Sequence, residues 1–272
     1  WADKSYRRPT VQHYYYNSIE LFDSNIYAKG SVIINMIRRY LGDDGFFRVL
    51  EQYTRTHAAN NVETTDLKKA IEITTGKNLD WFFEQWVYKP GVPEITATYR
   101  YNRRSQLVSL TLKQTQDVES TSLFKLPMVV VIDDGSVNRY DIFFDKVEDT
   151  FTFPAEMEPL MVGVDEGFQI PKRLTFEKKT DELLYQLKNA PVPNDRIWAA
   201  RALKETRSTK KIHSALVEML SAEPKWYVRK EIVKTYQSLK PRNGEVELIA
   251  VYTDQDDRVK RAIIRALREY DT

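Results

Sequence analysis

Residues 22–30 read Phe-Asp-Ser-Asn-Ile-Tyr-Ala-Lys-Gly and stand at the start of a helical pattern. From Tyr27 the apolar residues recur at steps of three and four, which is typical of one face of an amphipathic helix. Gly42 and Gly76 predict the ends of two helices, because glycine readily adopts the left-handed conformation found there. Helices are also predicted at residues 45–57, 64–75 and 79–87, with Thr64 or Thr65 as an N-cap. Residues 1–93 are therefore predicted to form a helical lobe.

A second stretch, residues 81–93, reads Trp-Phe-Phe-Glu-Gln-Trp-Val-Tyr-Lys-Pro-Gly-Val-Pro. Together the two stretches resemble the C-terminal half of the catalytic domain in the aminopeptidase N family of zinc metallopeptidases. In that family Tyr-x-Lys-Gly contains the catalytic tyrosine, and Trp, three further residues and Pro-Gly-x-Pro close the domain. The resemblance extends over roughly residues 5–175 and is strongest from Phe22 to Pro93. It implies a thermolysin-like catalytic lobe in which Tyr27 is catalytic.

The zinc-binding motif of that family is missing from the sequence. Two histidines four residues apart, with a glutamate beside the first, place both imidazoles on one helix face toward the metal. His13, His57 and His213 are scattered, and none is followed four residues later by histidine or cysteine. We therefore expect a C-terminal fragment that binds no zinc and is inactive alone, its parent being a zinc enzyme whose N-terminal catalytic lobe is missing here. The first residue, Trp1, agrees with this expectation because translation supplies a methionine.

Tyr27 is the candidate catalytic residue. The resemblance implies that its phenol donates a hydrogen bond to the oxyanion formed when zinc-bound water attacks the scissile carbonyl. A phenol with a pKa of about 10 is protonated at neutral pH, so it can stabilise negative charge without acting as a base. By itself, a tyrosine at the start of an apolar helix is usually a core residue. The neighbouring motif residues favour the catalytic interpretation.

Other residues near these motifs are interpreted as structural. Lys29 is predicted to be a solvated lysine at a helix start, the alternative being a pair with a carboxylate of the missing lobe, and Gly30 allows close packing. The aromatic residues of the last helix have the spacing of a buried face rather than of a substrate box. The same core interpretation applies to the tyrosine cluster, for which a specificity pocket is the alternative, and to one face of the helix at 45–57. The residues concerned are Trp81, Phe82, Phe83 and Trp86; Tyr14, Tyr15 and Tyr16; and Phe46, Phe47, Leu50 and Tyr53.

After Pro93 the apolar residues alternate with polar ones, which indicates half-buried strands. Six to eight short strands joined by turns are predicted over residues 94–178. Asp133 and Asp134 precede Gly135, and this favours a tight hairpin turn over a calcium site. An antiparallel β-sandwich is therefore the predicted fold of this segment.

Helical patterns return over residues 179–272 as a repeat. The intervals from Ile197 to Val228 and from Val228 to Val259 are both 31 residues, and the surrounding sequences are comparable. They resemble the Val-Arg-x-x-x-Ile/Ala pattern of short HEAT repeats. Helices between them, around residues 212–220 and 245–251, would complete the pairs. This segment is predicted to be an α-solenoid of stacked helix pairs.

Composition limits the possible partners. Lysine and arginine number 41 against 39 aspartate and glutamate, a net charge of +2 that gives no argument for nucleic acid. The chain has no cysteine and no apolar run long enough to span a bilayer. A peptide substrate is the partner implied for the parent, and the compartment stays open. The alternative function is a non-enzymatic, peptidase-like scaffold that binds a protein or peptide through its helical repeats.

Overall fold

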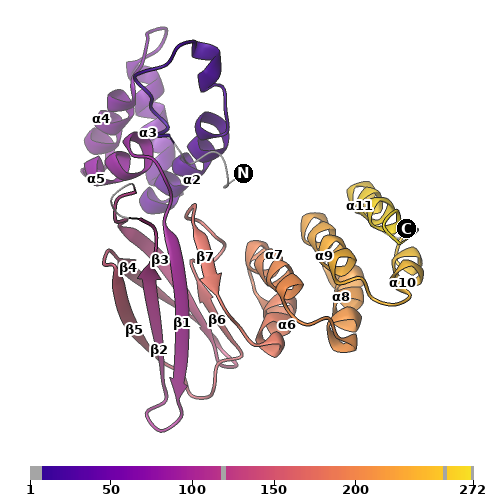
Figure 1. Cartoon of the computed structure of the whole chain (residues 1–272). Coiled ribbons are helices and arrows are strands. Elements are labelled where there is room, and N and C mark those ends of the chain that lie inside the picture. Colours follow the sequence, from indigo (N-terminus) through magenta and orange to yellow (C-terminus); the bar gives the residue numbers. More distant parts are fainter. Residues whose placement is uncertain (1–7, 118–120, 254–255, 271–272) are drawn as a thin grey trace.

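The computed structural model describes residues 8–117, 121–253 and 256–270. Trp1 lies outside the described residues. The chain forms three parts in order: a group of helices, two β-sheets, and a row of helices that extends away from the sheets (Figure 1). The predicted fold class is thus confirmed. Among the described residues, none of the helices has both the length and the apolar character that crossing a membrane requires.

The first part begins with a short 3₁₀ helix and a π-helical turn and continues as four α-helices. Gly42 and Gly76 end α2 and α4 with φ values of 73° and 68°, as predicted. The predicted N-cap of α4 is wrong. Glu63 holds that position, because its backbone N–H donates to the Asp66 carboxylate at 2.9 Å in a capping box. The elements are η1 Ser18–Leu21, η2 Asn25–Lys29, α2 Gly30–Leu41, α3 Asp43–Thr56, α4 Thr64–Thr75, α5 Asp80–Phe83 and the π-helical η3 Glu84–Tyr88.

The helices and the sheets share one hydrophobic core. Phe82, Phe83 and Trp86 are buried in it as predicted, and the rings of Trp86 and Phe124 lie 5.1 Å apart across the boundary. The inward orientation predicted for Phe47 is wrong, because its side chain is 54% exposed and Val49 is fully buried on that helix instead. Packing of apolar residues therefore joins the first two parts.

The second part is a sandwich of seven strands in the described residues. One sheet has the order β5-β2-β1-β7 and the other β4-β3-β6. All pairs are antiparallel except β1 and β7, which run parallel. Gly135 has a φ of 105° at the turn between β3 and β4, so the hairpin prediction is confirmed. The strands are β1 Glu94–Asn102, β2 Leu107–Gln114, β3 Leu126–Asp133, β4 Val137–Phe144, β5 Glu148–Pro154, β6 Met161–Val164 and β7 Arg173–Phe176.

The third part consists of helix pairs whose second members, α7, α9 and α11, lie side by side (Figure 1). Ile197, Val228 and Val259 occupy corresponding places on these three helices, and the two valines are fully buried. The repeat of 31 residues therefore marks the contact between successive pairs. The helices are α6 Thr180–Asn189, α7 Pro193–Ala202, α8 Lys210–Ala222, α9 Trp226–Leu239, α10 Gly244–Ala250 and α11 Asp257–Leu267, with the 3₁₀ helix η4 Leu203–Glu205 after α7.

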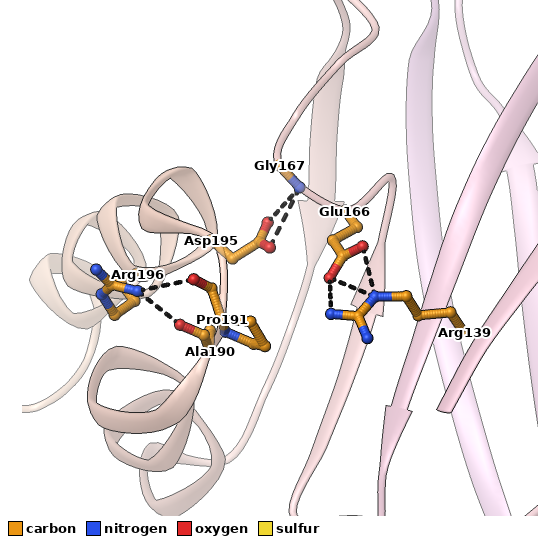
Figure 2. A network of polar contacts seen from close by, with 7 residues as sticks. All are labelled: Arg139, Glu166, Gly167, Ala190, Pro191, Asp195 and Arg196. Carbon is orange, nitrogen blue, oxygen red and sulfur yellow. Dashed lines mark hydrogen bonds and ion pairs between the residues drawn. The ribbon is translucent and has the colours of Figure 1, made fainter. Parts of the chain in front are cut away.

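Polar contacts join the sandwich to the solenoid. Asp195 on α7 accepts a hydrogen bond from the Gly167 backbone N–H at 3.0 Å, while Glu166 beside it pairs with Arg139 on β4 at 2.7 Å (Figure 2). Arg196 points the other way and donates to the Ala190 carbonyl at 2.7 Å (Figure 2). Burial, with the nearby carboxylates, raises the pKa of Asp195 to about 6. This network fixes the first helix pair against the loop that follows β6.

A buried ion pair supports the same junction. Glu182 on α6 pairs with Lys178 at 2.9 Å, and both side chains are almost fully buried. The same carboxylate accepts hydrogen bonds from the Tyr99 hydroxyl of β1 at 2.9 Å and from the Val162 N–H of β6 at 3.1 Å. Glu182 thus connects both sheets to the solenoid.

Candidate functional site

Tyr27 lies on the π-helical turn η2, directly before α2. Its side chain is 60% exposed, and its ring lies 6.2 Å from that of Phe22. The phenol is therefore not a core group, and the core interpretation of Tyr27 does not hold. A hydroxyl on an open surface is free to meet a substrate, as the predicted catalytic role requires.

Asp23 and Arg8 hold the turn that positions Tyr27. Arg8 donates from Nε to Asp23 Oδ2 at 3.0 Å, and its Nη2 lies 2.8 Å from Oδ1. Asp23 also accepts from the backbone N–H groups of Asn25 and Ile26 at 2.8 and 3.3 Å, which satisfies donors at the start of the turn. Burial acts to raise the pKa of Asp23, but hydrogen bonds from Asn25, Ile26 and Arg8 outweigh it and lower the pKa. The carboxylate is therefore charged at neutral pH and fixes the turn.

Lys29 contradicts its prediction as a solvated residue. Its side chain has no exposed surface, and Nζ has no hydrogen-bond partner among the described residues. Asn25 and Lys29 are four residues apart and lie together on the buried face of η2, whereas Ile26 and Tyr27 between them face outward. Burial, together with the charge of Arg8, lowers the pKa of Lys29 to about 8. The spacing from Asn25 was the sequence signal that could have revealed this orientation.

Replacing Lys29 with methionine is expected to stabilise the chain at pH 7. The folded-state pKa is about 8 against an ordinary 10.5, so the buried charge costs about 3 kcal/mol below pH 8. Between these values the unfolded chain binds more protons, so the wild type gains stability as pH rises. The advantage of Lys29→Met should therefore be largest at pH 7 and smaller at pH 10. Urea unfolding at both pH values measures it.

The exposed Lys69 on α4 provides the control for this substitution. Lys69→Met removes the same charge from a solvated position and is expected to change the free energy of unfolding by less than about 0.5 kcal/mol. A Lys29→Met chain that is less stable than wild type at pH 7 would contradict the proposed penalty of the buried charge.

Exposed apolar residues are frequent in the segment that leads to Tyr27. The packing predicted for Tyr14, Tyr15 and Tyr16 is wrong for the described residues, since Tyr14 and Tyr16 are 89% and 97% exposed. We call the following residues the aromatic surface: Tyr14, Tyr15, Tyr16, Ile19, Phe22, Ile26 and Tyr27. Exposed large apolar residues that lie together mark binding or interaction surfaces, and Phe22 and Tyr27 are in contact here.

The described residues do not form a zinc site. His13 is exposed before η1, His57 follows α3, and His213 lies on α8, where it contacts the Ser208 hydroxyl at 2.7 Å. In the described ranges no group of three or more histidine, aspartate or glutamate side chains is arranged to hold a metal ion. Asp133, for which a calcium site was the alternative to a hairpin turn, accepts hydrogen bonds from the Tyr185 hydroxyl at 3.1 Å and from the Gly135 N–H at 3.1 Å. These contacts give it a structural role in the hairpin.

Comparison with known protein families matches two segments of the chain. Residues 4–86 match the Peptidase family M1 domain, and residues 180–268 match HEAT repeats. The resemblance drawn from Tyr27-Ala28-Lys29-Gly30 and residues 81–93 is thereby confirmed, as is the interpretation of the repeat.

Individual relatives are similar over part of their length. Aminopeptidase N of Lactococcus lactis subsp. lactis is 42% identical over 78 residues, 28% of this chain and 9% of that protein. Leucyl aminopeptidase of Saccharolobus solfataricus is 27% identical over 150 residues, 55% of this chain and 18% of that protein. The tricorn protease-interacting factor F2 of Thermoplasma volcanium is 29% identical over 133 residues, 47% of this chain and 16% of that protein. The matched segment is thus less than a fifth of each relative.

A solved structure has the same fold. The crystal structure of Legionella pneumophila aminopeptidase A in complex with aspartic acid superposes on 98% of this chain with a TM-score of 0.78. The sequence identity is 16%, and the chain covers 38% of that structure. At this identity the likeness establishes the arrangement of helices, sandwich and solenoid and nothing about the ligand.

Proposed function

Because residues 4–86 match the peptidase family M1 domain, we propose that this chain is the C-terminal part of a zinc-dependent aminopeptidase that removes N-terminal residues from peptides. The observation that supports this most directly is the exposed phenol of Tyr27 within the motif Tyr-x-Lys-Gly. We assign residues 1–93 to the catalytic lobe, 94–178 to the sandwich domain and 179–272 to the solenoid.

Tyr27 is the catalytic residue that this chain contributes. A carbonyl oxygen becomes negatively charged when its carbon is attacked, and a phenol hydrogen bond stabilises that charge. The pair of Arg8 and Asp23 holds the turn on which the Tyr27 hydroxyl lies. The described residues do not fit a zinc site, so the metal ligands and the general base belong to the rest of the catalytic lobe.

One feature supports contact between this chain and that remaining lobe. The aromatic surface leaves several large apolar side chains in water, which another protein surface would cover. Lys29 Nζ and Asn25 Oδ1 are buried within this chain, so they present no surface that the other lobe could contact.

Metal content and turnover test this proposal. A longer protein that includes the preceding catalytic lobe is expected to bind zinc stoichiometrically and to release amino acids from aminoacyl p-nitroanilides. The 272-residue chain alone is expected to do neither. Zinc by atomic absorption and p-nitroaniline by absorbance give the two measurements. Stoichiometric zinc together with turnover by the purified 272-residue chain would refute the proposed division of the active site.

The alternative is a scaffold without peptidase activity. The longer protein would then lack His-Glu-x-x-His in the residues before this chain and would release no amino acid. Its function would depend on the solenoid, where a surface groove of strongly positive charge favours the binding of a partner.

A further inference from the structure

A groove on the solenoid lies between α9 and α11 and has a volume of about 390 Å³. Basic side chains line it in two rows, one on each helix. Each row forms because residues three, four or seven apart lie on the same helix face. We call it the basic groove, and its lining residues are Lys230, Lys234 and Gln237 on α9, and Arg258, Arg261, Ala262, Arg265 and Glu269 on or beside α11.

The five cations that line this groove outnumber its one acidic lining residue, Glu269, although Lys234 is paired with Glu231. Lys230 is half-buried, and neither it nor the exposed Arg265 forms an ion pair within the described part of the chain. Among the described residues, Arg261 donates to the Asp257 backbone carbonyl at 3.3 Å. Arg258 pairs with Asp256 at 2.9 Å and lies 3.8 Å from the centre of the Trp226 ring. The excess of positive charge is therefore local, although the whole chain is nearly neutral.

The helix pair before α11 has a buried carboxylate that the groove between α9 and α11 lacks. Between α7 and α9, the buried carboxylate of Glu231 pairs with Arg201 and Lys204 at 3.1 Å, and also with Lys234 at 3.3 Å. Burial acts to raise the pKa of Glu231, but the hydrogen bonds from Arg201 and Lys204 outweigh it and lower the pKa to about 2. The corresponding position one repeat of 31 residues later is Ala262. The last repeat thus keeps one cation of that cluster, Arg265 at the position of Lys234, but has no carboxylate at the position of Glu231.

We propose that the basic groove binds an acidic peptide segment. One carboxylate of the peptide lies above Ala262, the position that corresponds to Glu231 in the preceding repeat. Arginine side chains bind carboxylates in two-pronged pairs, and α-solenoids bind extended chains along their helices. A peptide fits better than nucleic acid, because no exposed aromatic ring in the groove is available to stack on bases. This site is separate from Tyr27 and does not depend on peptidase activity.

Binding of hexaglutamate to the 272-residue chain tests the proposal. Fluorescence anisotropy with a fluorescein-labelled hexaglutamate peptide is expected to show saturable binding that weakens as salt is raised, whereas hexaglutamine should bind at least about tenfold more weakly. The double substitution Arg261→Glu and Arg265→Glu should lower the affinity at least about tenfold. The matched control is Arg103→Glu with Arg104→Glu, the same change of charge on the exposed β1–β2 turn, which should leave the affinity unchanged.

Ala262→Glu provides a second, independent variant. It restores the carboxylate that the repeat lacks, so it should abolish hexaglutamate binding while leaving the circular dichroism spectrum and the melting temperature at or above the wild-type values. Equal affinity for hexaglutamine, or undiminished binding by both groove variants, would overturn the proposal. Tighter binding of a single-stranded oligonucleotide of equal charge would overturn the assignment to peptides.

Discussion

Replacing Tyr27 with phenylalanine in the proposed longer peptidase is expected to lower kcat by about 10²–10³ with little change in KM. Loss of one hydrogen-bond donor to an oxyanion typically has this effect, because the interaction forms in the transition state rather than with bound substrate. The substitution removes a single oxygen from a side chain that is 60% exposed, so it should leave the fold intact. Steady-state kinetics with an aminoacyl p-nitroanilide measure the result.

The control is Tyr16→Phe, the same chemical change on the same aromatic surface. Tyr16 is largely in water and lies outside the Tyr-x-Lys-Gly motif, so kcat should change by less than about twofold. If the Tyr27→Phe variant had the same kcat as the wild type, Tyr27 would not be a catalytic residue. The match of residues 4–86 to the peptidase domain would not be affected by that outcome.

Replacing Glu182 with glutamine is expected to destabilise the chain by about 3–5 kcal/mol, the usual result of removing one member of a buried ion pair. Lys178 would keep its charge in a site with almost no contact with water. Burial already lowers the pKa of Lys178, and Glu182 is the main group opposing that shift. The glutamine side chain would also have only one oxygen to accept hydrogen bonds from the Tyr99 hydroxyl and the Val162 N–H, which each donate to a different oxygen of the carboxylate. Urea unfolding at pH 7 gives the change.

Two further variants show whether the loss of stability comes from the buried charge of Lys178. Combining Glu182→Gln with Lys178→Met removes the uncompensated charge and should recover most of the lost stability. Glu218→Gln breaks the exposed pair with Lys188, whose atoms lie 2.8 Å apart, and should cost less than about 1 kcal/mol. Equal losses for the buried and the exposed pair would contradict the importance assigned to Glu182.

Local sequence signals predicted most of the fold, because they depend on neighbours in the chain. Gly42 and Gly76 end helices through a backbone conformation that glycine adopts freely. Asp134 and Gly135 form a hairpin turn for the same reason. The spacing of Val228 and Val259 reflects a contact that recurs in each helix pair, so the repeat alone was sufficient to predict the solenoid.

Features that depend on a single turn or on distant contacts were not predictable in this way. Lys29 was predicted to be solvated because a lysine at a helix start is usually in water, whereas it lies with Asn25 on the buried face of η2. The parallel pairing of β7 with β1 joins residues far apart in the sequence. Phe47 has the spacing of an inward residue, but Val49 occupies the core position on α3. The exposure of Tyr14, Tyr15 and Tyr16 was not predictable, because it depends on which parts of the folded chain lie next to them.

The contact between Trp86 and Phe124 has a mechanical consequence. A protease cut near Pro93 would separate two halves of one core, so neither half should survive as a soluble piece. A cut between β7 and α6 would instead open a junction made largely of hydrogen bonds, to which Trp198 adds apolar contacts. Under pulling force applied at its ends, the chain should therefore yield at the junction between sandwich and solenoid before it yields where helices and sandwich share a core.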